Sequence, residues 1–109
     1  MTPDKMYGYK AAMPAITAEE LEARIIEILD YGRIVLPNHV CERMGERNYA
    51  MGDIKHILKT GKILNFKNQG KEEYHCEIHG EDLEGVKGAV IAIVVKNFRL
   101  IIVTVLGGV

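Results

Sequence analysis

The chain has 109 residues and a mass of 12.2 kDa, which is enough for one domain and excludes a two-domain enzyme. Apolar residues make up 48% and charged residues 27%, a balance typical of globular proteins and not of disordered or disulfide-stapled chains. The 14 Lys and Arg against 15 Asp and Glu give a net charge of -1, which disfavours a protein that binds nucleic acid over its whole surface.

Cysteine content and apolar runs predict a cytoplasmic protein without a membrane span. Cys41 and Cys76 are too few for a disulfide framework, and free thiols fit a reducing compartment. The N-terminal residues lack the continuous apolar core of a signal peptide. The longest apolar runs, 89–95 and 100–106, are strand-sized and far shorter than the roughly 20 residues that a membrane helix needs.

The first half of the chain begins with an arm and a helix. Residues 1–16 show no hydrophobic periodicity and are expected to form a mobile arm. Thr17 and Glu20 have the spacing of a capping box, which predicts a helix over 18–31. Gly32 is expected to end this helix in the left-handed conformation.

A short strand and two short helices follow. The β-branched stretch 33–36 predicts the strand, which Pro37 stops. A second helix is expected over 39–47 with Asn38 as its N-cap, and Asn48 suits a left-handed turn after it. A third helix is expected over 52–60, ending at Gly61, with a poor N-cap residue in Met51.

The second half of the chain predicts a sheet. The short links, including a tight turn at Asn97–Phe98, predict an antiparallel meander. The wholly apolar run 89–95 predicts a central strand that is buried on both faces. The fold class is therefore α+β, a helix followed by β-α-α-β-β-β-β, with helices packed on one face of the sheet. The four strands of the meander are expected at residues 62–67, 73–80, 88–95 and 99–106.

Charge is distributed unevenly along the chain. Residues 33–71 carry 8 basic and 3 acidic groups, a net charge of +5, whereas each flank carries -3. Within this basic segment, His39, Arg43 and Arg47 fall at i, i+4 and i+8 and share one helix face. This stripe fits a phosphate or carboxylate clamp, with a histidine that transfers a proton. On chemistry alone it fits better a surface in which the arginines pair with nearby carboxylates and His39 bonds to the backbone.

The strand expected at 73–80 carries a second polar set. Alternation places Tyr74, Cys76 and Ile78 on one face and His75, Glu77 and His79 on the other. The two histidines could therefore contact one ligand. Metal-ligand spacings such as C-x-x-C or H-E-x-x-H do not occur in the sequence, so neither a metal nor a cofactor is expected.

Several motifs resemble one family. The stretches "PNHVCERMGER", "LKTGKI", "YHCEIHGEDLEG", "AVIAIVV" and "LIIVTVL" are similar to the pattern of domain-of-unknown-function family 4258 over about residues 33–106. The chain departs from this pattern at Asn48, where Gly is usual, and at Met51, where Ser or Thr is usual. The resemblance covers an α+β domain at 33–106, which the arm (1–16) and the amphipathic helix (17–32) precede.

The resemblance implies a fold similar to the RelE/ParE and BrnT toxins, with two short helices on a curved antiparallel meander sheet. It also implies a toxin-like endoribonuclease of a toxin–antitoxin pair, which cleaves RNA without a metal ion. By motif match the resemblance implies catalytic roles for His39, Arg43 and Arg47, and for Tyr74 as the meander residue nearest to the family's pattern. Position alone adds the substrate-binding candidates His75, His79 and Thr104.

The expected partners follow from the same resemblance. They are RNA and an antitoxin of the zinc-ribbon or helix-turn-helix type, and an edge strand is available to pair two copies in a homodimer. The rival interpretation is a non-catalytic protein-binding module with the same fold, because fold alone does not determine activity.

Overall fold

The computed structural model describes residues 16–70 and 72–107, which form three helices and a five-stranded sheet. The predicted elements are confirmed in type and order, and their bounds differ from the predicted ones by at most one residue. The arm expected at residues 1–16 lies outside the described residues except for Ile16. The elements are α1 (Ala18–Tyr31), β1 (Arg33–Val35), α2 (Asn38–Glu46), α3 (Met51–Thr60), β2 (Lys62–Asn68), β3 (Tyr74–Glu81), β4 (Lys87–Val95) and β5 (Arg99–Gly107).

The sheet has the strand order β1-β5-β4-β3-β2. Strands β2 to β5 form the predicted antiparallel meander. Strand β1 pairs with β5 in parallel, so the sheet is mixed and the expectation of a purely antiparallel sheet is wrong. Parallel pairing requires a long crossover connection, which the chain from α2 to β4 supplies. The three residues of β1 are too few to show a sequence pattern that predicts this pairing.

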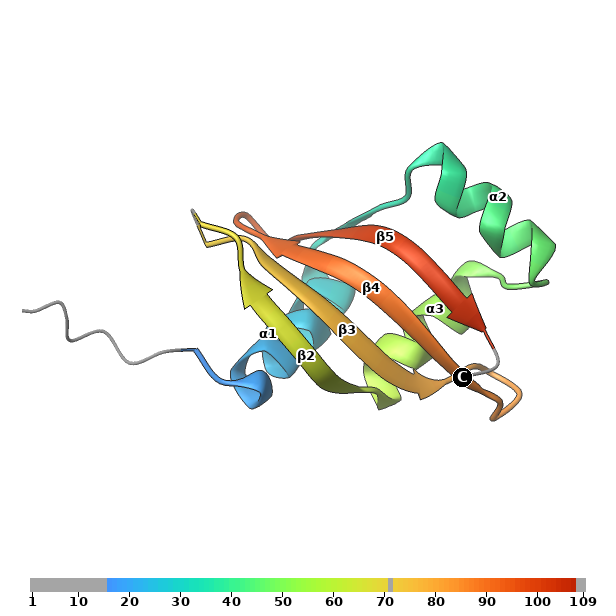
Figure 1. Ribbon diagram of the computed structural model, residues 1–109, viewed down its shortest axis with the longest axis horizontal. Coiled ribbons are helices and arrows are strands. Elements are labelled where there is room, and N and C mark those ends of the chain that lie inside the picture. The colour runs from blue at the N-terminus through green and yellow to red at the C-terminus, as the bar shows by residue number, and fades with distance from the viewer. Residues whose placement is uncertain (1–15, 71, 108–109) are drawn as a thin grey trace, which may run out of the picture.

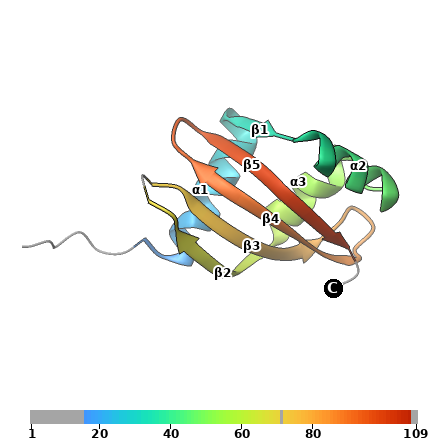
Figure 2. The same ribbon diagram turned by 45° about the horizontal axis from the view of Figure 1, so that its top comes forward.

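The helices and the sheet form two layers. Helices α1 and α3 lie against one face of the sheet, and within residues 16–70 and 72–107 no helix lies on the opposite face (Figures 1 and 2). Helix α2 lies beside β5, at the edge of the sheet (Figure 1). None of these helices, in the part of the chain that the structure describes, is long and apolar enough to cross a membrane. Buried residues from all three helices share one core with the sheet: Leu21, Ile25, Ile28, Val40, Met44, Ile54, Ile57 and Leu58.

Strand β4 is central, as its apolar run predicts, but only one of its faces is covered. Val90, Ala92 and Val94 are buried beneath the helices. On the opposite face Ala89 and Val95 are also buried, but Ile91 and Ile93 are half-buried. The expectation of burial on both faces is therefore confirmed only in part. An unbroken apolar run shows that both faces of a strand are hydrophobic and does not show what covers each of them.

Helix ends and turns agree with the sequence in most places. The Thr17 hydroxyl accepts a hydrogen bond from the Glu20 amide, and the Glu20 carboxylate accepts one from the Thr17 amide, as the capping box predicts. The left-handed conformation expected at Asn48 is confirmed, with φ of 56°. At the start of α2, Pro37 occupies the N-cap without a side-chain bond, so the capping role expected for Asn38 is wrong.

Gly32 has a different role from the one expected. Its φ of -109° is not left-handed. A Cβ atom at this position would collide with the carbonyl oxygen of Phe98, in the turn between β4 and β5. Glycine is thus required because two segments of backbone approach each other closely, and a local helix-ending pattern does not report such a contact.

Candidate functional site

The uncovered face of the sheet carries the polar residues of β3. Cys76 and Ile78 are buried on the helix side, so His75, Glu77 and His79 lie on the opposite side, as the alternation predicts. Their partners across β4 are Ile93, Ile91 and Ala89. These three polar side chains stand at the border of an apolar strip.

His79 and Glu77 form a close pair on this face. The Nε2 atom of His79 lies 2.7 Å from the Oε2 atom of Glu77, and both side chains are partly exposed. This geometry favours the tautomer in which Nε2–H donates to the carboxylate, which leaves Nδ1 as a proton acceptor. A carboxylate that orients an imidazole is the arrangement that a general base requires.

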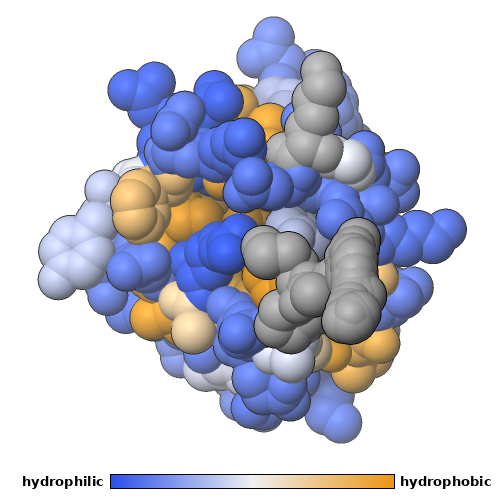
Figure 3. Space-filling view, turned by 90° about the vertical axis from the view of Figure 1, so that its left-hand side faces the viewer, coloured by the Kyte–Doolittle hydropathy of each residue, from blue (hydrophilic) through white to orange (hydrophobic). Residues whose placement is uncertain are grey.

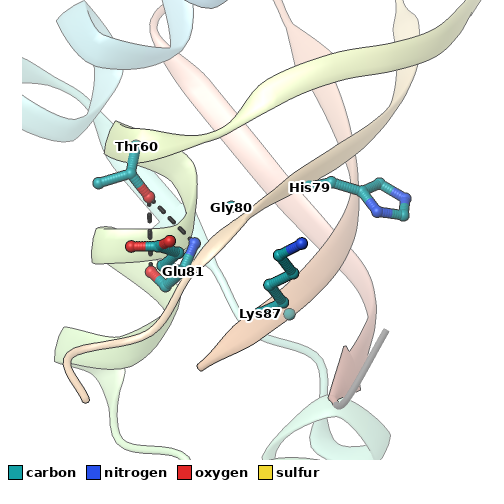
Figure 4. A pocket seen from close by; sticks show the side chains of 6 residues that line it. Thr60, His79, Gly80, Glu81 and Lys87 are labelled. Carbon is teal, nitrogen blue, oxygen red and sulfur yellow. Dashed lines mark hydrogen bonds between the residues drawn. The ribbon is translucent and has the colours of Figure 1, made fainter. Parts of the chain in front are cut away.

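A hollow of about 570 Å³ lies beside this pair (Figure 4). His79 and Lys87 extend along one side of it, and Thr60 and Glu81 form the other side (Figure 4). The Glu81 amide donates to the Thr60 hydroxyl at 3.1 Å, and the Thr60 hydroxyl donates to the His56 carbonyl at 2.8 Å. These bonds hold the end of α3 against β3, so one wall of the hollow is fixed.

The uncovered face is positively charged. The strand registers place five cations and two carboxylates on this face among the described residues, and one of the cations, Lys62, pairs with the Glu22 carboxylate of α1 at 3.9 Å. A polyanion therefore meets a favourable local potential here, although the whole chain has a net charge of -1. The cations are Arg33, Lys62, Lys67, Lys87 and Arg99, and the carboxylates are Glu77 and Glu81.

The stripe expected on the second helix is present on α2, but its members have different surroundings. Val40 and Met44 are buried, so the stripe borders the buried face as predicted, and Arg43 is exposed. The Nε2 atom of His39 lies 2.9 Å from the carbonyl oxygen of Val103 in β5. That nitrogen is therefore occupied by backbone, and only Nδ1 remains for another partner.

Arg47 lies in a separate hollow of about 600 Å³ that is rich in carboxylates. Its Nε atom is buried and has no hydrogen-bond partner among the described residues. Burial, followed by the charges of Asp82 and Asp53, raises the pKa of Tyr49 in the same hollow, and Arg47 acts in the opposite direction. The carboxylates compensate the charge of Arg47 locally, which weakens it as a phosphate ligand. Those that line the hollow belong to Glu46, Asp53, Asp82 and Glu84.

The structure does not gather all the predicted site residues at one place. Tyr74 is half-buried and packs against the core on the helix side of β3. Two strands, β4 and β5, separate β3 from α2, so Tyr74, His75 and His79 are distant from the α2 stripe. Thr104 lies on the uncovered face, where Ile91 separates it from Glu77 in one cross-strand row.

The roles of two members of this site were not predicted from sequence. Lys87 belongs to the acidic C-terminal third, so the charge division obscured it, although its pairing with Glu81 places it near His79. Glu77 lies between the two histidines on the alternating face, and its bond to one of them was not expected. Both roles could have been identified from sequence by pairing the expected strands 73–80 and 88–95 and by following the alternation of side chains along each strand.

Comparison with known proteins gives one match. The family model described as "Domain of unknown function (DUF4258)" matches residues 36–106, from the end of β1 to β5. No curated protein and no solved structure matches the chain. Helix α1 lies outside the matched range, although its residues Leu21, Ile25 and Ile28 belong to the shared core.

Proposed function

The chain belongs to the DUF4258 family of domains of unknown function, and from the site on its sheet we propose that it is a toxin-like endoribonuclease. The pair formed by His79 and Glu77 carries this proposal, because it presents an oriented imidazole on an uncovered, cationic face. RNA supplies the matching groups, a phosphate for the cations and a ribose hydroxyl for the base. We place the enzyme in a toxin–antitoxin pair, as the resemblance implies.

The reaction uses groups of the chain and of RNA, with water as the final proton donor. The Nδ1 atom of His79 accepts the proton of a ribose 2′-hydroxyl, and the 2′-oxygen attacks the adjacent phosphorus. The bond between phosphorus and the 5′-oxygen breaks, and that oxygen takes a proton from water. The products are a 2′,3′-cyclic phosphate and a free 5′-hydroxyl. Lys87, which lines the same hollow as His79, stabilises the negative charge that develops on the phosphate oxygens.

The test compares cleavage of a single-stranded RNA of about 12 nucleotides by the full chain and by single variants. His79→Ala should lower the cleavage rate by about 100- to 10,000-fold, the usual contribution of a general base. Glu77→Gln should cause a smaller loss, because it keeps a hydrogen bond and removes the charge. Lys55→Ala is the matched control, since Lys55 is an exposed lysine on α3, away from the uncovered face.

The same assay shows whether the catalytic site lies on the uncovered face of the sheet or on α2. Arg43→Ala removes the exposed cation of the α2 stripe, and a catalytic site at His79 predicts that cleavage is retained. If Arg43→Ala abolishes cleavage and His79→Ala does not, the catalytic site lies on α2. Cleavage of the all-deoxy oligonucleotide would contradict attack by the 2′-hydroxyl.

A second candidate function is a non-catalytic protein-binding module. The apolar strip at the centre of the uncovered face favours it, because Ile91, Ile93 and Ile101 are half-buried there and no helix of the described residues covers them. This function predicts binding to the product of the adjacent gene, loss of that binding in Ile93→Glu, and no cleavage of RNA. Cleavage that depends on His79 would exclude it as the only function.

A further inference from the structure

We propose that a second site on this chain stacks unpaired bases of the RNA at the end of the sheet opposite the hollow beside His79. The site consists of Tyr31 at the end of α1, Arg33 in β1, Phe98 in the β4–β5 turn and Arg99 in β5, and is called the aromatic–arginine platform. The proposal rests on the proposed function in that RNA is the ligand of both sites.

The aromatic rings of the platform are exposed. Tyr31 is 84% exposed and Phe98 is 50% exposed, and both line a hollow of about 370 Å³ together with Gly32 and Asn97. Figure 3 shows the end of the molecule that includes the β4–β5 turn, where hydrophobic side chains lie among hydrophilic ones. Exposed rings beside guanidinium groups are the combination that binds single-stranded nucleic acid, since every base has a face that can stack.

The backbone holds Phe98 in a costly conformation. Asn97 and Phe98 have φ of 65° and 53°, and a bulky residue rarely adopts this left-handed conformation. The Arg33 amide donates to the Phe98 carbonyl at 2.8 Å, and Gly32 allows the close approach. The turn is thus fixed against the start of β1, which positions the exposed ring in advance of binding. Such strain is typical of functional sites.

The two arginines oppose each other directly. Arg33 and Arg99 are Cα partners in the pairing of β1 with β5, and both are exposed. Like charges at opposed positions destabilise a sheet. Among residues 16–70 and 72–107, no carboxylate lies within ion-pair distance of either guanidinium. A phosphate bound between them relieves this repulsion, and guanidinium groups suit phosphate geometry.

The platform and the His79 site share one face of the sheet. Arg99 pairs with Val95 of β4, and His79 pairs with Ala89 of the same strand. The two rows are therefore six positions apart along β4, which corresponds to about 20 Å at the rise of a β-strand. Ile91 and Ile93 lie between them. The substrate class is consequently a single strand that runs along β4 and reaches both sites, not a duplex.

The experiment measures the Kd of His79→Ala protein for a fluorescein-labelled oligouridylate of about 12 nucleotides by anisotropy. Adding Tyr31→Ala should raise the Kd by about 5- to 100-fold, the usual range for one stacked base. Tyr31→Phe should preserve the Kd, because stacking needs the ring and not the hydroxyl. Phe98→Asn should raise it as well, since Asn tolerates the left-handed turn and removes the ring.

Two further variants separate stacking from charge. Arg99→Ala should weaken binding and reduce the slope of log Kd against log salt concentration by about one. Leu64→Ala is the matched control, because Leu64 is 63% exposed on β2 and should leave the Kd unchanged. A duplex RNA of the same length should bind equally to the His79→Ala protein with and without the Tyr31→Ala change.

The outcomes distinguish this proposal from the ribonuclease. An unchanged Kd in both Tyr31→Ala and Phe98→Asn, or no binding of the oligouridylate at all, overturns the platform. If the wild-type chain cleaves RNA normally and the Kd is unchanged in these variants, the platform is overturned and the ribonuclease is not. Absence of cleavage with a Tyr31-dependent Kd overturns the ribonuclease and supports the platform.

Discussion

His39 in α2 and Val103 in β5 are joined by a hydrogen bond of 2.9 Å between Nε2 and the carbonyl oxygen. Strand β1 covers the edge of β5 only at residues 99–101, and α2 lies beside the remainder. At the other edge of the sheet, the Glu22 carboxylate accepts a hydrogen bond from the Ile63 amide at 2.8 Å. A helix side chain thus satisfies a backbone group at each edge, which opposes pairing with another chain.

The bond between His39 and Val103 predicts a structural effect of His39→Ala. We expect the free energy of unfolding in urea to fall by about 1 kcal/mol, the net contribution of one hydrogen bond. RNA cleavage should be retained if the site lies on the uncovered face. Arg43→Ala, at an exposed position of the same helix, should leave the stability unchanged. Lost cleavage with unchanged stability in His39→Ala would make His39 a catalytic residue.

Asp53 joins the start of α3 to the loop between β3 and β4. One carboxylate oxygen accepts from the Ala50 amide at 2.9 Å, and the other accepts from the Leu83 amide at 3.1 Å. Asp53→Ala should lower the free energy of unfolding by about 1 to 2 kcal/mol, as for a lost helix cap. Native-state hydrogen exchange should accelerate at Ala50 and Leu83. Protection at Leu83 that survives in Asp53→Ala would show that other contacts hold the loop.

Two glycines predict opposite effects of substitution by alanine. A Cβ atom at Gly80 would collide with the carbonyl oxygen of Ile57 and would lie 2.9 Å from Gly61 Cα, so Gly80→Ala should destabilise the fold by about 1 to 3 kcal/mol. Gly45 lies within α2 with nothing within 4 Å, and Gly45→Ala should stabilise the protein by up to about 1 kcal/mol. Thermal unfolding of the two variants measures both effects. A higher Tm for Gly80→Ala would contradict the close contact of α3 with β3.

The two cysteines predict one reactive and one protected thiol. Cys41 is exposed, whereas burial raises the pKa of Cys76 from 9.0 to about 11. At pH 8 a thiol reagent should therefore modify one cysteine of the folded protein rapidly and the second only after unfolding. Cys41→Ala should remove the rapid phase. A rapid phase that persists in Cys41→Ala would show that Cys76 is accessible.

The same pKa predicts how stability depends on alkaline pH. The unfolded chain loses the Cys76 proton above pH 9, and the folded chain loses it only above about pH 11. The contribution of this thiol to the free energy of unfolding is thus complete below pH 9 and declines as the pH rises to about 11, by on the order of 3 kcal/mol. Urea denaturation of the wild type and of Cys76→Ala across this range measures it. Parallel curves for the two proteins would contradict the raised pKa.

Local patterns in the sequence determined most of the secondary structure. The apolar spacing in α1, its capping box and the alternation in β3 are set by residues a few positions apart, and the structure confirms them. The same alternation placed His75, Glu77 and His79 on one face. The charge division also indicated a basic segment, because Lys62 and Lys67 of β2 belong to it.

The tertiary structure decided which of these residues meet. His39 and Val103 are 64 residues apart, and the chain between β1 and β5 contains the other three strands of the meander. Neither contact produces a periodic pattern of residues in the sequence, because each depends on how the helices and strands pack together. The sequence by itself therefore determined the elements and the faces of their side chains. Packing decided that His39 closes a sheet edge and that His79 meets Glu77 on the open face, because these arrangements depend on strand pairing and side-chain packing that local periodicity does not encode.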